Sequence, residues 1–303
     1  TWASNRTFCC AFSTGSAEEA RKILEKAGPF EVHAVAPDKL RNAIQAAVVR
    51  GAKRILIAGG DGSIATAASV VAGTDVELAV LPGGTLNHFA KDHGIPTDLA
   101  EALEVAVSGV TRKADVGYVG DKLFLNTSSI GAYVTFVRVR ERFEKHFGYR
   151  IASALAMIRI MTRLRPVRVE VEVDGRTNSY RSPIVFVGVG QRELQMPSLG
   201  SRIEQGERGL QVMVVNGSSA ARVLALALAA VAKGTRKASH TPEMDSFIVD
   251  KFAIELQHRS AGVAVDGEIV AMETPLEYRI ARDSLTIVVP PGSHAKQEDT
   301  GKS

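Results

Sequence analysis

The sequence predicts an α/β protein of two domains: a doubly wound domain with a parallel sheet, followed by a β-rich, sandwich-like domain. Its 303 residues exceed what one compact domain usually holds. Up to about residue 115, strand and helix patterns alternate at short spacing, which is typical of parallel strands joined by right-handed crossovers. Beyond that point, many short strand-like runs with turn signals favour an antiparallel sandwich.

The N-terminal elements follow one another as strand and helix. The run FCCAF predicts a strand, and a Ser16–Glu19 capping box opens a helix that ends at Gly28. The next elements are the strand FEVHAV, a helix over Lys39–Arg50, the apolar strand RILIAG, a helix from near Ser63, the strand ELAVL, and a helix over Thr97–Ser108. This alternation is what the doubly wound prediction requires.

The second half of the chain has a different pattern. A basic helical segment, 135–165, precedes PVRVEVEVDG, whose strict alternation closes on an Asp-Gly turn. An apolar helix covers Ala221–Gly234. The other strand-like runs are SPIVFVGVG, GLQVMVV, SFIVDKFAIELQ, AGVAVDGE, PLEYRIA and SLTIVVP. We therefore expect mainly antiparallel strands here, and a polar, disordered tail over 292–303.

Composition narrows the classes of function. The net charge of +4 is too small to indicate nucleic acid, although it suits an anionic substrate or membrane surface. Aromatic residues are only 6% and are not interleaved with basic ones, as a single-strand-binding surface would need. Adjacent Cys9 and Cys10 predict a reduced, buried pair and fit a cytoplasmic protein. The apolar helix is shorter than the about 20 residues that span a bilayer, so we expect a soluble or peripheral protein.

Two glycine loops carry the strongest chemical signal. Residues 59–62 (GGDG) end a buried strand just before a helix, and Gly83-Gly84-Thr85 with Asn87 follow the next strand. The carboxyl edge of a parallel sheet is where such folds bind ligands, and bare backbone with helix-start amides suits phosphate. Asp61 is placed to hold Mg²⁺ or to orient an attacking hydroxyl, which is phosphoryl-transfer chemistry.

Other interpretations of these loops are open. Each loop alone is as readily a tight turn between strand and helix, although two on neighbouring strands favour a ligand. Neither loop matches G-x-x-x-x-G-K-[ST], and no G-x-G-x-x-G with a downstream acid follows the first strand. The residues therefore argue against an ordinary P-loop or dinucleotide site.

Four motifs together resemble the diacylglycerol kinase catalytic family, which includes bacterial lipid kinases and sphingosine kinases. GGDGS resembles its GGDGT signature, LPGGTLNHFAKDHGIP resembles its second motif, and DVGYVGDKLFLNTSSIG and AVDGE match later landmarks in order. NAD kinases and phosphofructokinases also carry GGDG. The resemblance implies a Rossmann-like domain over 1–125, joined by 276–291 from the C-terminus, and a lipid-acceptor domain over 126–275.

The resemblance also implies roles for particular residues. Asp61 and Glu268 would be catalytic, Asp61 as the Mg²⁺ ligand and Glu268 as the base that takes the proton of the lipid hydroxyl. Asp115 would be an acidic position near the cleft. The ATP site would consist of Gly59, Gly60, Gly62, Ser63, Gly84, Thr85 and Asn87. Without the family context, Asp266-Gly267-Glu268 predicts a plain hairpin turn.

The chain departs from the family pattern at several positions. Ser63 replaces threonine, and His88 replaces the usual aspartate near the presumed Mg²⁺. Where some members carry paired aspartates for a structural Mg²⁺, this chain has only Glu204 and Glu207 nearby, with Gln211 in the strand. A second metal is therefore not expected, and weakened catalysis is an open alternative.

The predicted function is an ATP-dependent lipid kinase acting on a lipid such as diacylglycerol, with ATP and Mg²⁺ as cofactors. The basic segment 135–165 fits either peripheral contact with the inner, anionic membrane face or a packed helix with a charged solvent face. A homodimer is one option for the oligomeric state. The alternatives are a kinase of NAD or another small molecule, and a nucleotide- or lipid-binding regulator.

Overall fold

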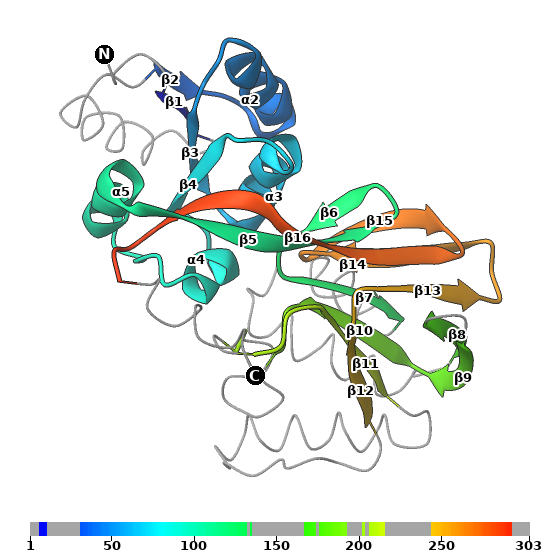
Figure 1. Ribbon diagram of the computed structural model, residues 1–303. Coiled ribbons are helices and arrows are strands. Elements are labelled where there is room, and N and C mark those ends of the chain that lie inside the picture. The colour runs from blue at the N-terminus through cyan, green and yellow to red at the C-terminus, as the bar shows by residue number, and fades with distance from the viewer. Residues whose placement is uncertain are drawn as a thin grey trace, which may run out of the picture. The chain divides into compact units, whose positions relative to one another are not determined.

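The computed structural model shows two compact units (Figure 1). One unit consists of Thr1–Val116 and Ala281–Ser303, and the other of Gly117–Ile280. The chain passes between them within two long strands, β5 (Val110–Val119) and β16 (Leu276–Val289). The sequence predicts the boundaries between the two domains at residues 125 and 276, close to the ends of these two strands. The structure describes residues 6–10, 31–131, 134, 167–173, 176–192, 202–203, 206–215 and 244–292.

The first unit is built on parallel strands, as the α/β prediction requires. The strand order is β2 (Glu31–Ala34), β1 (Arg6–Cys10), β3 (Arg54–Gly59), β4 (Glu77–Pro82) and the C-terminal part of β16. Every neighbouring pair in this series is parallel. All residues of β3 are buried, which explains why its sequence is apolar without alternation.

Most of the helices described in the first unit bury apolar residues, and one of them has a side-chain cap. They are η1 (Pro37–Lys39), α2 (Leu40–Val49), α3 (Asp61–Val71), α4 (His88–Asp92) and α5 (Leu99–Ser108). The buried positions of α2 are Leu40, Ile44 and Ala47, which lie on one face of the helix. Asp98 caps α5 by accepting from the amides of Ala100 and Glu101 at 3.0 and 3.1 Å.

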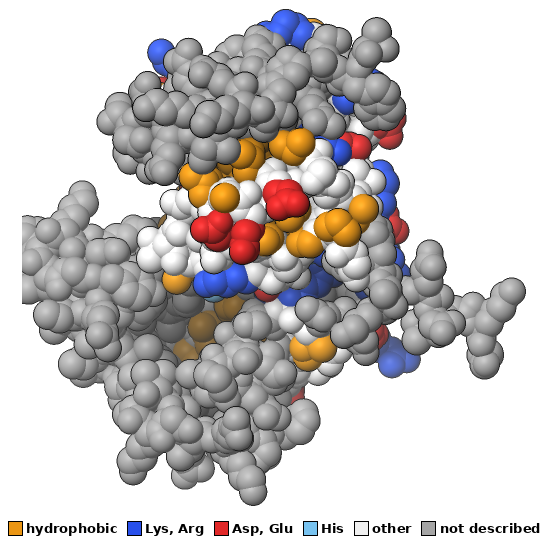
Figure 2. Space-filling model, turned by 90° about the vertical axis from the view of Figure 1, so that its left-hand side faces the viewer, with side chains coloured by type: hydrophobic (Ala, Val, Ile, Leu, Met, Phe, Trp, Pro, Cys, Tyr) orange, Lys and Arg blue, Asp and Glu red, His pale blue; other side chains and the backbone are white. Residues whose placement is uncertain are grey.

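Figure 2 shows the side of the unit on which α5 lies, where acidic side chains are found among hydrophobic ones.

The second unit is an antiparallel β structure whose core draws on two groups of strands. One sheet has the order β12 (Met244–Val249), β11 (Leu210–Val215), β10 (Ile184–Val189), β7 (Thr127–Gly131), β14 (Ser260–Val265) and β15 (Glu268–Glu273). The other runs from the N-terminal part of β16 through β13 (Lys251–Leu256) and β8 (Val167–Val173) to β9 (Arg176–Ser182). Val187 and Val212 of the first share one buried cluster with Val169 and Ile254 of the second. This confirms the β-rich, sandwich-like prediction.

Three strand predictions differ from the structure. Strand β9 (RTNSYRS) was not expected, because its residues are mostly exposed and polar. SFIVDKFAIELQ is not one strand: it breaks at Asp250 into β12 and β13, which belong to different sheets. Conversely, PLEYRIA and SLTIVVP form the single strand β16, with the left-handed residue Asp283 (φ 54°) inside it. The short β6 (Lys122–Phe124) pairs with β5 as a hairpin.

Several predictions fall on residues outside the described ranges. These are the helix from Ser16 to Gly28, the basic segment 135–165, the apolar helix 221–234, Glu204, and the tail beyond Gly292. The described residues include the backbone of the strand with Cys9 and Cys10 but not its side chains. No helix among the described residues has the length and hydropathy that a bilayer span requires.

Candidate functional site

The first glycine loop turns β3 directly into α3. Gly60 is extended (φ −81°, ψ 179°) and precedes the helix, and its carbonyl accepts from the amides of Ser63 and Ile64 at 3.0 and 3.1 Å. No side chain caps this helix start. A Cβ added to Gly59 would lie 2.8 Å from the Cβ of Ser63, so a side chain does not fit there. The loop therefore presents backbone and helix-start amides, the groups that bind anionic oxygens.

The second glycine loop is shaped by Asn87. This residue is left-handed (φ 50°) and buried, and its Oδ1 accepts from the amide of Gly84 at 2.9 Å. The helix α4 begins at the next residue. The side-chain oxygen of Asn87 thus serves the turn of its own loop, a role typical of asparagine in turns.

The two loops touch backbone to backbone. The amide of Gly83 donates to the carbonyl of Gly59 at 3.0 Å. A Cβ on Gly84 would lie 2.7 Å from the Cα of Gly60 and 3.0 Å from Oδ1 of Asn87. Because real Cβ contacts are essentially never that short, the packing of the other loop by itself requires glycine at position 84.

Asp61 joins the loops through its carboxylate. Oδ2 accepts from the amide of His88 at 3.2 Å, and Oδ1 accepts from the amide of Phe89 at 3.1 Å. Asp61 is the first residue of α3, and its carboxylate caps the start of α4. The residue is half-buried, and each oxygen retains a further lone pair. A carboxylate with unused lone pairs beside bare backbone fits a magnesium ion whose other ligands are phosphate oxygens and water.

The predicted nucleotide residues therefore lie at one sheet edge in the first unit. Gly60, Gly62 and Ser63 are half-buried there, while Thr85 and His88 are exposed. Asp115 has a different environment within the same unit. It is 5% exposed, and its Oδ1 accepts from the amide of the left-handed Asp283 at 2.9 Å. Asp115 thus links β5 to the left-handed residue within β16.

Glu268 belongs to the second unit and follows a two-residue hairpin turn. Asp266 (φ 46°) and Gly267 (φ 90°) are both left-handed, as a type I′ turn requires. Glu268 is the first residue of β15, pairs with Val265 of β14, and is exposed. The hairpin predicted from the sequence alone is present, and the role of Glu268 as a base stays a prediction.

Asp266 is the residue at this turn that sequence reasoning missed. Its carboxylate accepts from the backbone amides of Leu125, Asn126 and Thr127 at 2.7, 2.8 and 3.0 Å. Burial raises the pKa of Asp266, while these three amides and the charge of Arg192 act in the opposite direction. Aspartate in an Asp-Gly turn was the only signal in the sequence, and it predicts a turn without predicting a buried carboxylate.

The position considered for a structural metal is occupied by an amide network. Gln211 is 4% exposed; its Oε1 accepts from the amide of Arg192, and its Nε2 donates to Oγ of Ser246 at 3.1 Å. Glu207 is exposed. Within the described ranges, no group of three or more His, Cys, Asp or Glu side chains could hold a metal by itself.

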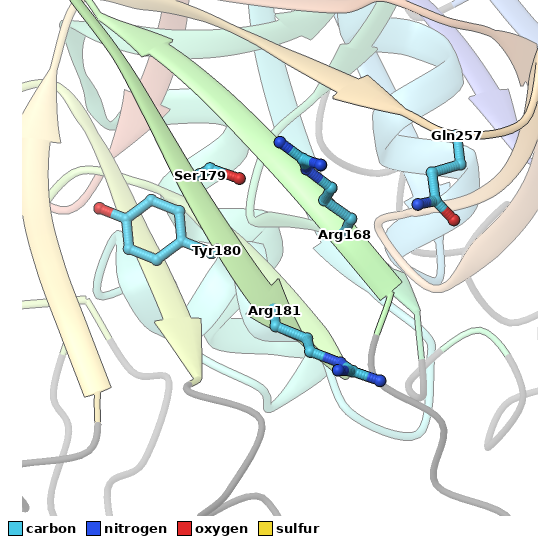
Figure 3. Close-up of a pocket in the computed structure, with 5 residues that line it drawn as sticks. All are labelled: Arg168, Ser179, Tyr180, Arg181 and Gln257. Atoms are coloured by element: carbon cyan, nitrogen blue, oxygen red, sulfur yellow. The ribbon is translucent and has the colours of Figure 1, made fainter.

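One pocket lies on the second unit (Figure 3). It encloses about 490 Å³ and is lined by Arg168, Ser179, Tyr180, Arg181 and Gln257. The guanidinium of Arg168 lies 3.1 Å from the carboxylate of Glu170, so its charge is already paired. None of the lining residues was predicted for the site. The pocket therefore does not mark the chemistry that the motifs indicate.

Comparison with known proteins agrees with the motifs. Residues 13–119 match the family described as the diacylglycerol kinase catalytic domain. The chain is 31% identical over 140 residues to a diacylglycerol kinase of Mycobacterium tuberculosis, covering 45% of each chain. It is 33% identical over 139 residues to a diacylglycerol kinase of Bacillus subtilis, covering 45% of this chain and 46% of that one. The aligned part thus spans about half the length of these curated relatives.

Similarity of fold extends much further along the chain. A crystal structure of a diacylglycerol kinase from Bacillus anthracis str. Sterne has a TM-score of 0.67 at 17% identity, covering 95% of this chain and 97% of that chain. An NAD kinase from Archaeoglobus fulgidus, solved with ATP, has a TM-score of 0.50 at 13% identity. At such identities these structures establish the two-domain fold alone.

Proposed function

Because residues 13–119 match the diacylglycerol kinase catalytic domain family, we propose that this protein is an ATP-dependent lipid kinase. It transfers the γ-phosphoryl group of ATP to a hydroxyl of a lipid such as diacylglycerol. The observation that carries the proposal is the joined pair of glycine loops, in which the Asp61 carboxylate holds the second loop against the first. Two bare loops at one sheet edge suit a polyphosphate better than a single turn would.

In the proposed mechanism, the first unit binds and orients ATP. The amides at the start of α3 and the exposed backbone of both loops receive the phosphate oxygens. Asp61, through its remaining lone pairs, would hold Mg²⁺, which offsets the charge of the phosphates. Asn87 and Gly84 keep the second loop in the shape that this binding needs, because their hydrogen bond sets the turn.

Glu268 is the proposed base. The lipid hydroxyl oxygen forms a bond to the γ-phosphorus, the bond from that phosphorus to the β–γ bridging oxygen breaks, and ADP leaves. The hydroxyl proton passes to the Glu268 carboxylate. Exposure of Glu268 at the end of a hairpin supports this role, since a base must be reachable by its substrate.

A related kinase activity is the main rival. An NAD kinase shares the fold, and GGDG is not specific for lipid kinases. A non-catalytic, nucleotide- or lipid-binding regulator is the second rival, because the exposed His88, whose backbone amide binds Asp61, replaces an acidic residue. Cytoplasmic location, peripheral membrane contact and dimerisation are further parts of the proposal; the segment 135–165 that suggests the membrane contact lies outside the described residues.

The test is a phosphoryl-transfer assay with radiolabelled ATP. The purified full chain is given Mg²⁺ and, in separate reactions, dioleoylglycerol in mixed micelles, a total lipid extract, and NAD. We expect label in lipid and none in NAD, and we expect Asp61→Ala to abolish turnover while its thermal melt stays close to wild type. Label in NAD alone would favour the first rival, and tight ATP binding without any product would favour the second. Wild-type turnover by Asp61→Ala would remove Asp61 from the mechanism.

A further inference from the structure

Asp266 has more hydrogen bonds than a turn aspartate needs. Besides the three amides that its carboxylate accepts, its own amide donates to the carbonyl of Thr127 at 2.8 Å. All four bonds go to the segment 125–127, which is about 140 residues away in the sequence. The tip of the β14–β15 hairpin is therefore anchored at a second point, beyond the ladder that holds its strands.

The segment that receives Asp266 is itself fixed. Leu125 and Asn126 are 4% and 6% exposed, and the carbonyl of Asn126 accepts from the amide of Val189 at 3.0 Å. Thr127 begins β7, whose next residue, Ser128, pairs with Val265 of β14. Because the segment 125–127 is held in place, its hydrogen bonds to Asp266 restrain the turn.

From this arrangement we infer that Asp266 is a positioning residue for Glu268. The inference rests on the proposed function, in which Glu268 takes the proton of the lipid hydroxyl. Glu268 stands two residues after Asp266, across the turn, and pairs with Val265. Because the carboxylate of Asp266 fixes the turn, it also fixes where the Glu268 backbone begins. A base that is displaced by about 1 Å can lose about a hundredfold in rate.

The chemistry of the anchor explains why aspartate stands at position 266. Three amide donors need both oxygens of a carboxylate: Oδ1 takes Asn126 and Thr127, and Oδ2 takes Leu125. An asparagine offers a single oxygen and would turn an NH₂ group toward one of the amides. The Asp266→Asn variant therefore keeps nearly the same side-chain size but loses one of the two acceptor oxygens.

The test is a double-mutant cycle on the full chain, with kcat measured for ATP and dioleoylglycerol micelles. We expect Glu268→Gln to lower kcat by about 10²- to 10⁴-fold, and Asp266→Asn to lower it by about 10- to 100-fold with the KM for ATP unchanged. In the Glu268→Gln background, Asp266→Asn should cause no further loss, because a positioning residue acts only through the group it positions. Asp121→Asn is the matched control, an exposed turn aspartate of the same unit with wild-type kcat expected.

The outcomes separate the inference from the proposed function. Wild-type kcat for Glu268→Gln contradicts the proposed base itself. If Glu268→Gln is slow but folded Asp266→Asn keeps wild-type kcat, or if the two losses multiply, the positioning role is overturned. Should Asp266→Asn fail to fold, the cycle is repeated with Gly267→Ala, which leaves the carboxylate in place but strains the turn at φ 90°. A loss that does not multiply with Glu268→Gln supports the inference, and wild-type or multiplicative behaviour overturns it.

Discussion

Two aspartates, one in each unit, make the same kind of contact: the carboxylate of each accepts hydrogen bonds from backbone amides. Asp61 accepts two backbone amides from the start of α4, and Asp266 accepts three from the segment 125–127. Each carboxylate joins its own turn to a segment distant in sequence. Both residues are half-buried, but they differ in the number of amides bound, and at Asp266 burial of the carboxylate raises its pKa.

The difference shows how one kind of contact can serve binding or stability. At Asp61, accessible lone pairs remain after the loops are joined, so the carboxylate is free to meet a ligand. At Asp266, three amides take most of the hydrogen-bonding capacity of the carboxylate. We therefore expect the removal of Asp61 to lower turnover with little effect on the free energy of unfolding, and the removal of Asp266 to lower both.

The largest predicted effect is that of Asp266→Ala on stability. The change leaves three enclosed amides without their acceptor, and each such group costs about 1–3 kcal/mol. We expect a loss of about 3–5 kcal/mol, measured by urea unfolding of the full chain. For Asp61→Ala we expect only about 1 kcal/mol, the usual cost of losing a helix cap. Equal losses in the two variants would break the comparison.

A smaller effect is expected where the glycine loops meet. Gly84→Ala places a methyl group 2.7 Å from the Cα of Gly60, so the loops must separate. We expect about 1–3 kcal/mol of destabilisation together with weaker ATP binding, measured by calorimetric titration. Gly60→Ala is the matched control, because its Cβ would lie 3.4 Å from the Cα of Gly84, and it should cost less on both measurements. If Gly84→Ala binds ATP like wild type, contact between the loops is not needed for the site.

The smallest effect concerns pH. The folded-state pKa of Asp266 is raised above its ordinary value of 3.8, so its contribution to stability is fully present below that value and is lost as pH rises through the raised pKa. Asp266→Asn has no such dependence. The difference in unfolding free energy between wild type and Asp266→Asn should therefore narrow as pH increases from about 4 to 7, by about 1.4 kcal/mol per unit of pKa shift. A gap that widens instead would mean that the amides and Arg192 outweigh burial.

Local patterns in the sequence predicted much of the first unit. The buried strand β3, the helices α2 and α5, and the parallel direction of the strands follow from apolar runs, helical spacing and the alternation of strand and helix, all of which act between near neighbours. The second unit was less predictable. The run 246–257 predicts one strand, but it breaks at Asp250 into two strands of different sheets. Strand β9 lacks the hydrophobic alternation by which a strand is predicted.

The sequence by itself determined the α/β class, the two glycine loops, and the Asp-Gly hairpin before Glu268, because each depends on residues that are adjacent in the chain. Only the tertiary structure decided that Asp61 caps α4, that Gly84 faces Gly60, and that Asp266 is enclosed by the amides of 125–127. These contacts join segments that are far apart in sequence, and their hydrogen bonds use backbone amides, which every residue except proline carries. No pattern of side chains can therefore reveal them before the chain has folded.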